Sequence, residues 1–339
     1  KFLMAEGRFT YIASGSMLGI TLHKTQSIPI GSIHRIRMYP LDFEEFLIAN
    51  GVGDLTIQVM RQSYEREEPL SEAIHRKILD YFKKYLLVGG MPACVASFVK
   101  EQNITLVREM HNDIHELYAD DAAKYEKESS RRLKIQRIYQ LVPSNMENKK
   151  KRMVAKEIEG KQGKRMDNYQ DEFDYLLSSG IALGVKAISQ PTFPLVQNMG
   201  KNLLKLYLND VGMFSAILYR TNTLPILGDV ASINLGAVYE TVVAQELKAH
   251  GFELYYYDNK QIGEVDYLID DYPNMSVLPI EVKSGRDYKI HSAINSFLSN
   301  ESYQIKRAYV LSNERNVFRE RGILYMPVYY VMFINNTDR

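Results

Sequence analysis

Residues 263–270 read Gly-Glu-Val-Asp-Tyr-Leu-Ile-Asp, and residues 278–283 read Leu-Pro-Ile-Glu-Val-Lys. In the first segment the Val, Tyr and Ile at odd-numbered positions alternate with Asp266 and its even-numbered neighbours. Successive side chains of a strand point to opposite faces, so this alternation predicts a strand that turns Asp266 away from the Val/Tyr/Ile face. In the second segment Glu281 and Lys283 share one face for the same reason. Two adjacent strands would therefore present Asp266, Glu281 and Lys283 together.

An aspartate, a glutamate and a lysine at fixed strand positions are the residue set of a metal-dependent phosphodiesterase. Asp266 and Glu281, with the Val282 carbonyl, would hold Mg²⁺ through hard oxygen ligands and leave coordination sites for a phosphate oxygen and for water. Lys283 would orient the attacking water or help to deprotonate it, and would offset charge on the phosphate. Two other interpretations stay open: a fold that keeps its acidic cluster without turnover, and a Lys283–carboxylate ion pair that holds two strands together.

A helix is predicted over residues 236–249, upstream of both strands. At about 100° per residue, Glu240 falls on the apolar side of this helix. An uncompensated buried charge is costly, so this carboxylate needs a partner or a metal, and Glu240 could bind a second metal or anchor the water. The chain that follows predicts three strands, a helix around residues 293–298 and a strand at 307–312, which together form an α/β domain.

Composition places few limits on function. At 339 residues the chain is long enough for two or three domains, and 45% hydrophobic with 24% charged residues is an ordinary globular composition. A formal net charge of +1 gives no overall attraction to nucleic acid, so any such binding would come from a local basic patch. The single cysteine, Cys94, excludes an internal disulfide framework and a zinc site built from several cysteines.

The chain carries no signal for a membrane or for secretion. It has no run of 18 apolar residues and no signal-peptide pattern. We therefore expect a soluble, cytoplasmic protein with no membrane partner.

Residues 129–200 have the pattern of a winged helix, with three helices followed by an apolar strand-like run. Basic residues around its second helix and before its third could neutralise the phosphates of a nucleic acid. They are Lys149, Lys150, Lys151, Arg152, Lys164 and Arg165. The third helix, residues 167–177, also carries four acidic residues, which would repel a DNA backbone. Two interpretations stay open: contact with nucleic acid, or an interdomain connector with a solvated basic loop.

Several motifs, in their order along the chain, resemble a bacterial and archaeal family of AAA-type ATPases. They are Tyr-Ile-Ala-Ser-Gly-Ser (11–16), Ile-Pro-Ile-Gly (28–31), Tyr-Pro-Leu-Asp-Phe-Glu-Glu-Phe-Leu (39–47), Tyr-Leu-Leu-Val-Gly-Gly-Met-Pro (85–92), Leu-Tyr-Leu-Asn-Asp-Val-Gly (206–212) and the stretch 236–283. In that family a P-loop domain is followed by a winged helix and a C-terminal domain with a restriction-endonuclease-like fold. The resemblance covers nearly the whole chain.

The resemblance implies an α/β multidomain protein in four parts. They are the C-terminal remnant of an AAA-type core (1–50), a helical lid (51–128), the winged helix (129–200) and a restriction-endonuclease-like domain (201–339). Asp266, fourteen residues and then Glu281-Val-Lys283 resembles the PD-(D/E)xK signature of such domains, and Glu240 matches their upstream helical acidic residue. The resemblance thus implies a Mg²⁺-dependent nuclease domain, or a DNA-binding or protein-assembly module that keeps this fold without activity.

The chain lacks the loop that such a protein needs to hydrolyse ATP. Hydrolysis requires a G-x-x-x-x-G-K-[S/T] loop to wrap the phosphates, and the nearest glycine–lysine cluster, residues 160–165, has the wrong spacing. The chain begins at Lys1 rather than methionine, in what reads as mid-domain, so we expect a segment to precede it in the natural protein. ATP is expected as a cofactor of the full-length family only.

Two short strands are expected near the N-terminus, at Phe9–Ala13 and Ile33–Met38. After the first, Ser14 and Ser16 would occupy the sensor position of such an ATPase, but without a phosphate-binding loop they have nothing to sense. The arginines of the second, Arg35 and Arg37, are predicted to lie on a solvated strand face.

Helices are expected to follow these strands. Asp42 is placed to cap a helix that begins at Phe43. Residues 65–127 have helical periodicity, with a break at Gly89-Gly90. We expect this region to form a small helical lid.

Overall fold

The computed structural model describes residues 9–15, 34–121, 126, 128–148, 151, 153, 155–159, 166–199, 203–228, 235–284 and 292–336. These residues form helices and one mixed sheet of eight strands, which confirms the predicted α/β class. Within the described ranges, no helix has the length and apolarity needed to cross a membrane.

The helices and strands have the following bounds. The helices are α3 (Phe43–Ala49), α4 (Asp54–Glu65), α5 (Glu72–Val88), α6 (Pro92–Glu101), α7 (Ile104–Asp121), α8 (Ser129–Glu147), α9 (Ala155–Glu159), α10 (Gln170–Ser179), α11 (Val211–Tyr219), α12 (Leu224–Leu227), α13 (Gly236–Ala249) and α14 (Ser292–Ser299). The strands are β1 (Ala182–Ala187), β2 (Leu204–Leu208), β3 (Tyr255–Asn259), β4 (Gly263–Asp271), β5 (Ser276–Val282), β6 (Ala308–Ser312), β7 (Phe318–Glu320) and β8 (Ile323–Pro327).

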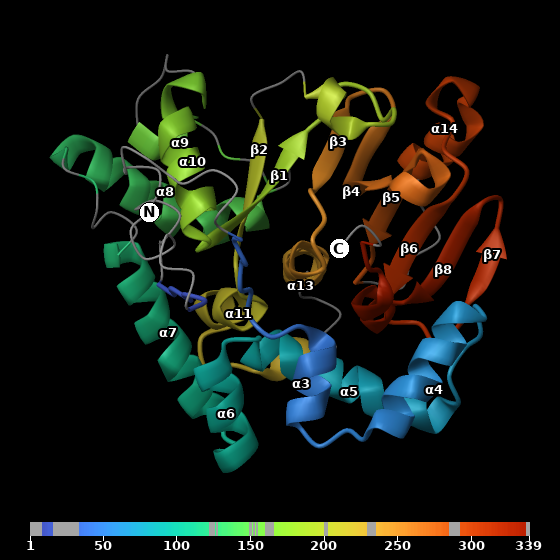
Figure 1. Ribbon diagram of the computed structural model, residues 1–339, viewed down its shortest axis with the longest axis horizontal. Coiled ribbons are helices and arrows are strands. Elements are labelled where there is room, and N and C mark those ends of the chain that lie inside the picture. Colours follow the sequence, from blue (N-terminus) through green and yellow to red (C-terminus); the bar gives the residue numbers. More distant parts are fainter. Residues whose placement is uncertain are drawn as a thin grey trace.

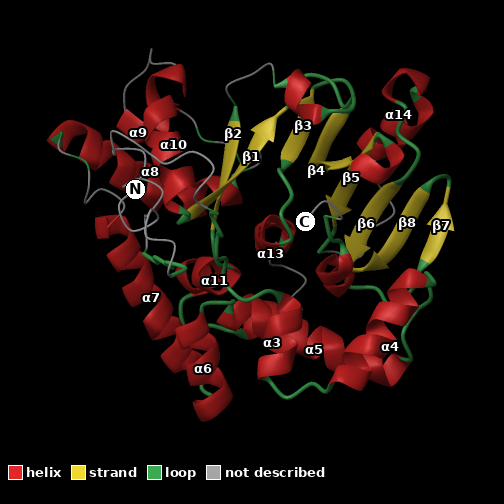
Figure 2. Ribbon diagram, in the orientation of Figure 1, coloured by secondary structure: helices red, strands yellow, loops and turns green. Residues whose placement is uncertain are grey.

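The sheet has the strand order β2-β1-β3-β4-β5-β6-β8-β7, and Figure 2 shows the strands side by side. Strands β3, β4 and β5 are antiparallel neighbours, and β6 runs parallel to β5. The predicted order of helix, three strands, helix and strand is confirmed by α13, β3, β4, β5, α14 and β6. Strand β1 pairs in parallel with β3, so the sheet continues across residue 200, where a domain boundary was expected. The division into four domains stays a prediction.

Helix α13 lies between the sheet and the helices α3 and α5 (Figure 1). Its apolar side, including Val243 and Leu247, belongs to the same buried core as Tyr267 of β4 and Ile280 of β5. A second core, which includes Phe297, covers the other face of the sheet under α14. Every side chain of α13 from Ala237 to Leu247 is buried, so any polar group on it needs a partner inside the protein.

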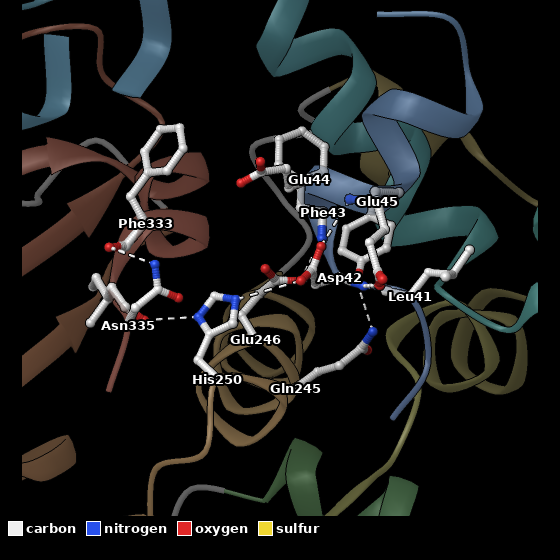
Figure 3. A network of polar contacts seen from close by, with 12 residues as sticks. Leu41, Asp42, Phe43, Glu44, Glu45, Gln245, Glu246, His250, Phe333 and Asn335 are labelled. Carbon is white, nitrogen blue, oxygen red and sulfur yellow. Dashed lines mark hydrogen bonds and ion pairs between the residues drawn. The ribbon is translucent and has the colours of Figure 1, made fainter. Parts of the chain in front are cut away.

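Figure 3 shows a buried polar network where the C-terminal half of α13 meets α3. Glu246 Oε1 accepts a hydrogen bond from Phe43 N at 3.0 Å and from the Tyr85 hydroxyl at 2.9 Å. His250 Nε2 lies 3.7 Å from Asp42 Oδ2. Because Asp42 also caps α3, this network fixes the start of α3 against the end of α13.

Two of the quoted motifs meet where α5 ends and α11 begins. A Cβ atom on Gly89, whose φ is +66°, would lie 2.1 Å from Asp210 Oδ1, and one on Gly212 would lie 2.4 Å from Gly89 N. Gly90 N donates a hydrogen bond to Asp210 Oδ2 at 2.7 Å. Only residues without a Cβ atom allow this approach, and a positive φ also favours glycine.

The local signals for the first helices are confirmed. Asp42 accepts from Glu45 N, and the Glu45 side chain accepts from Asp42 N, which completes a capping box. Helix α5 ends at Val88, before Gly89. The first helix of the 129–200 region, α8, continues through Pro143 to Glu147.

The prediction of two N-terminal strands is wrong for the residues that the structure describes. Residues 9–15 and 34–38 have no regular secondary structure, and their side chains are exposed. A strand leaves backbone groups unpaired unless a neighbouring strand bonds to them, and none of the eight strands of the described sheet adjoins these segments. The expected exposure of Arg35 and Arg37 is confirmed. Ser14 is exposed as well, and Ser16 lies outside the described residues.

Candidate functional site

The candidate site lies where α13 crosses the ends of β4 and β5. Glu240 is in the second turn of α13, Asp266 is in β4, Glu281 is in β5, and Lys283 follows the end of β5. The sheet therefore brings together the four residues that the sequence singled out. The Glu240 and Glu281 carboxylates contact different lysines, Lys151 and Lys283.

A bulge in β4 changes the direction of its side chains. On β3 one residue, Tyr256, separates two register pairs, whereas on β4 two residues, Asp266 and Tyr267, separate them. Such an insertion breaks the alternation of faces. Val265 and Leu268 consequently both pack under α14, and Tyr267 packs under α13. The prediction that the odd-numbered Val, Tyr and Ile share one face is therefore wrong.

Asp266 occupies the centre of the site. Its Oδ2 accepts a hydrogen bond from Val282 N at 2.9 Å, which fixes the carboxylate between β4 and β5. Continuing the antiparallel register places Asp266 opposite Glu281. Burial raises the pKa of both Glu240 and Glu281, and the charge of Asp266 raises both further. Asp266 is thus the shared neighbour of the two glutamates.

Glu240 has a basic partner from a distant part of the chain, between α8 and α9. Its side chain is 4% exposed, and its Oε1 contacts the ammonium group of Lys151. The Tyr207 hydroxyl lies 3.4 Å from Oε2, and the Tyr267 hydroxyl donates to the Glu240 backbone oxygen at 2.7 Å. The expectation that this buried carboxylate needs a partner is confirmed, and Lys151 supplies it.

Glu281 is paired with Lys283 on one oxygen only. Lys283 Nζ lies 2.7 Å from Glu281 Oε1, whereas Oε2 is buried without a hydrogen-bond partner. Burial raises the pKa of Glu281 to about 8, and Asp266 adds to the rise against the opposing Lys283. The ion pair joins residues two apart on one segment. The Asp266–Val282 hydrogen bond, rather than the lysine, links the two strands.

The sequence reasoning missed Lys205. Its side chain is fully buried in β2, contacts Glu264 of β4, and places Nζ 4.7 Å from the centre of the Tyr256 ring. Burial lowers the pKa of Lys205, but Glu240 and Glu264 raise it more, so the net shift is upward. A lysine within the apolar run Leu-Leu-Lys-Leu-Tyr-Leu, residues 203–208, was the signal that could have found it.

The predicted basic patch is only partly described. Lys149, Lys150, Arg152, Lys164 and Arg165 lie outside the described residues. Lys151 is described, and it contacts Glu240 of the candidate site. Contact of this patch with nucleic acid stays a prediction.

The oxygen atoms of the site suit a hard divalent cation. Glu281 Oε2 is buried and unpartnered, and the nearby charge of Asp266 raises the pKa of Glu281. Carboxylate oxygens are the ligands that Mg²⁺ takes in proteins. In the part of the chain that the structure describes, no group of three or more His, Cys, Asp or Glu side chains is already arranged to hold a metal. Glu240 and Glu281 each turn one oxygen toward a lysine.

Comparison with protein families gives two matches. Residues 79–224 match a family model described as a domain of unknown function (DUF8612), and residues 235–331 match another described as a domain of unknown function (DUF4143). The second match contains Glu240, Asp266 and Lys283, whereas Lys151 falls in the first. No curated protein and no solved structure matches the chain. The candidate site thus draws its residues from both matched regions.

Proposed function

We propose that the C-terminal region is a Mg²⁺-dependent phosphodiesterase domain of the restriction-endonuclease-like type, acting on nucleic acid in an AAA-type ATPase-like protein. The observation that carries this proposal is the placement of Asp266 opposite Glu281 in neighbouring strands of a helix–three strands–helix–strand unit. The resemblance of Asp266, Glu281 and Lys283 to the PD-(D/E)xK signature supports it. ATP hydrolysis is not proposed for residues 1–339, because their sequence contains no phosphate-binding loop.

Each residue of the site has a role in this proposal. Asp266 and Glu281 would hold Mg²⁺, which when bound polarises the phosphate and lowers the pKa of a bound water. Lys283 orients the attacking water and offsets the charge that develops on the phosphate oxygens. Glu240, on α13, would hold a second cation in place of its ion pair with Lys151.

A second candidate is a DNA-binding or protein-assembly module without turnover. It is favoured by the two direct ion pairs, Lys151–Glu240 and Lys283–Glu281, which neutralise carboxylates without a metal. Under this proposal the charged site stabilises the fold, and the region docks a partner.

Cleavage assays separate the two candidates. We expect the protein to cut at least one member of a panel of single- and double-stranded DNA and RNA with Mg²⁺ or Mn²⁺. Asp266→Asn, Glu281→Gln and Lys283→Ala should each lower the rate at least about a hundredfold. Glu301→Gln, an exposed change in the same region, is the control and should leave the rate unchanged. A folded protein that cuts none of these substrates would favour the module without turnover.

A further inference from the structure

Lys151 reaches the candidate site from the connector between α8 and α9. Its backbone has a φ of +45°, in the left-handed region that is uncommon for a lysine, and its N donates to Asn148 O at 3.1 Å. Two residues on, Met153 N donates to Leu204 O of β2 at 3.4 Å. These two hydrogen bonds hold Lys151 next to the end of α8 and Met153 against the edge strand β2, and Lys151 contacts Glu240.

The two lysines near Glu240, Lys205 and Lys151, differ in how far their side chains are buried. Lys205 is wholly enclosed, between Glu264 and the Tyr256 ring. Lys151 keeps 20% of its side chain exposed and belongs to no helix or strand. Lys151 is therefore the cation that can move into solvent while the sheet stays intact.

We propose that Lys151 competes with a divalent cation for Glu240, so that metal binds there only when Lys151 leaves. The inference rests on the proposed function, since it assumes a metal site around Asp266. The Lys151 ammonium contacts Glu240 Oε1 directly, and a metal ligated by the same oxygen would place two cations against one atom. Like charges at such distances repel strongly in a buried site. The connector would thus set the metal affinity of the site.

Mn²⁺ binding, followed by the electron paramagnetic resonance signal of the free ion, tests this competition without an activity assay. We expect Lys151→Gln to bind Mn²⁺ about tenfold more tightly than the natural sequence, or to gain a second site. Lys151→Arg keeps the charge and should behave like the natural sequence. Lys156→Gln is the matched control, because Lys156 is exposed on α9. Adding Glu240→Gln to Lys151→Gln should remove the gain.

A measurement on the unaltered chain covers the case in which Lys151→Gln fails to fold. Acylation of lysine amines, read by mass spectrometry, should become several-fold faster at Lys151 when Mn²⁺ is added, while Lys205 stays protected. If Mn²⁺ binds but leaves both Lys151 acylation and the Lys151→Gln affinity unchanged, the competition is overturned and the proposed function stands. If no variant binds Mn²⁺, both fall. Release of Lys151 by Mn²⁺ without cleavage of any substrate would keep this inference and overturn the nuclease.

Discussion

Glu246 is a carboxylate enclosed between α3, α5 and α13 (Figure 3). Burial raises its pKa to about 8, and Asp42 adds to the rise, while His250 and the hydrogen bonds from Tyr85 and Phe43 oppose it. Its Oε2 has no hydrogen-bond partner. The folded protein therefore holds a proton on Glu246 at a pH where the unfolded chain has released it.

This proton makes stability depend on pH. A carboxyl group whose folded pKa is raised contributes stability below its unfolded pKa of 4.5, and that contribution is lost as pH rises through about 8. The free energy of unfolding of Glu246→Gln should therefore exceed that of the natural sequence by on the order of 1–3 kcal/mol at pH 8–9, and should equal it near pH 5. Urea unfolding at several pH values, followed by circular dichroism, measures this. Glu65→Gln, at an exposed site, is the control and should show the same change of unfolding free energy with pH as the natural sequence. The same pH dependence in both variants would contradict the prediction.

The sequence predicted which residues form the candidate site, but not the face of the sheet to which each β4 side chain points. Glu240, Asp266, Glu281 and Lys283 meet as expected, because strand alternation and helical periodicity are local properties. The bulge at Asp266 depends on pairing with β3, which no local pattern specifies. The same holds for Lys151, whose partner is 89 residues away in the chain.

Helix α11 is held at both ends by other elements. Asp210 accepts from Met213 N at its start, and at its end Arg108 of α7 donates to Ser215 O at 2.7 Å and contacts Arg220 O. Arg108 is 1% exposed and serves as the C-terminal cap of α11. Contacts with α7 and with the end of α5 therefore stabilise this nine-residue helix, which is too short to be stable alone.

The close contact of α11 with the end of α5 predicts a large effect of one methyl group. Gly212→Ala would place a Cβ atom 2.4 Å from Gly89 N, where backbone has to move, so we expect a loss of at least about 2 kcal/mol. Gly15→Ala adds the same group where no atom lies within 4 Å, and should change stability by less than about 0.5 kcal/mol. Urea unfolding measures the stability of both variants. Equal unfolding midpoints would show that the end of α5 and the start of α11 can move apart at little cost.

Elements whose local signals agree with their packing were predicted from sequence, including the strands of the α13–β6 unit, whereas the expected N-terminal strands have no partner in the described sheet. The capping box at Asp42 and the break at Gly89 set the bounds of α3 and α5. The expected strand at Phe9–Ala13 has a suitable composition, but a strand forms only where a neighbour bonds to it. Pro143 lies inside α8, and its side chain is buried. Tertiary packing outweighs a local helix-breaking signal there.

At the scale of the whole molecule, one sheet joins regions that the sequence assigned to different domains. Strand β1 pairs with β3 through Lys186–Tyr255 and Ala187–Tyr256, and β2 carries Lys205 into the candidate site. Helix α13 packs against β1, β2 and β5 as well as α5. The core under α13 is therefore shared by residues 129–200 and 201–339, and we expect both regions to unfold together.

Native-state hydrogen exchange tests this shared core. Leu247→Ala removes a fully buried side chain of α13 and should lower the free energy of unfolding by about 2–5 kcal/mol. If the sheet unfolds as one unit, amides of β1 and β5 lose protection by the same amount. Leu133→Ala, at an exposed position of α8, is the control and should leave both strands unchanged. Loss of protection in β5 with β1 unaffected would show that residues 129–200 open as a unit of their own, and that the pairing of β1 with β3 does not couple the two regions.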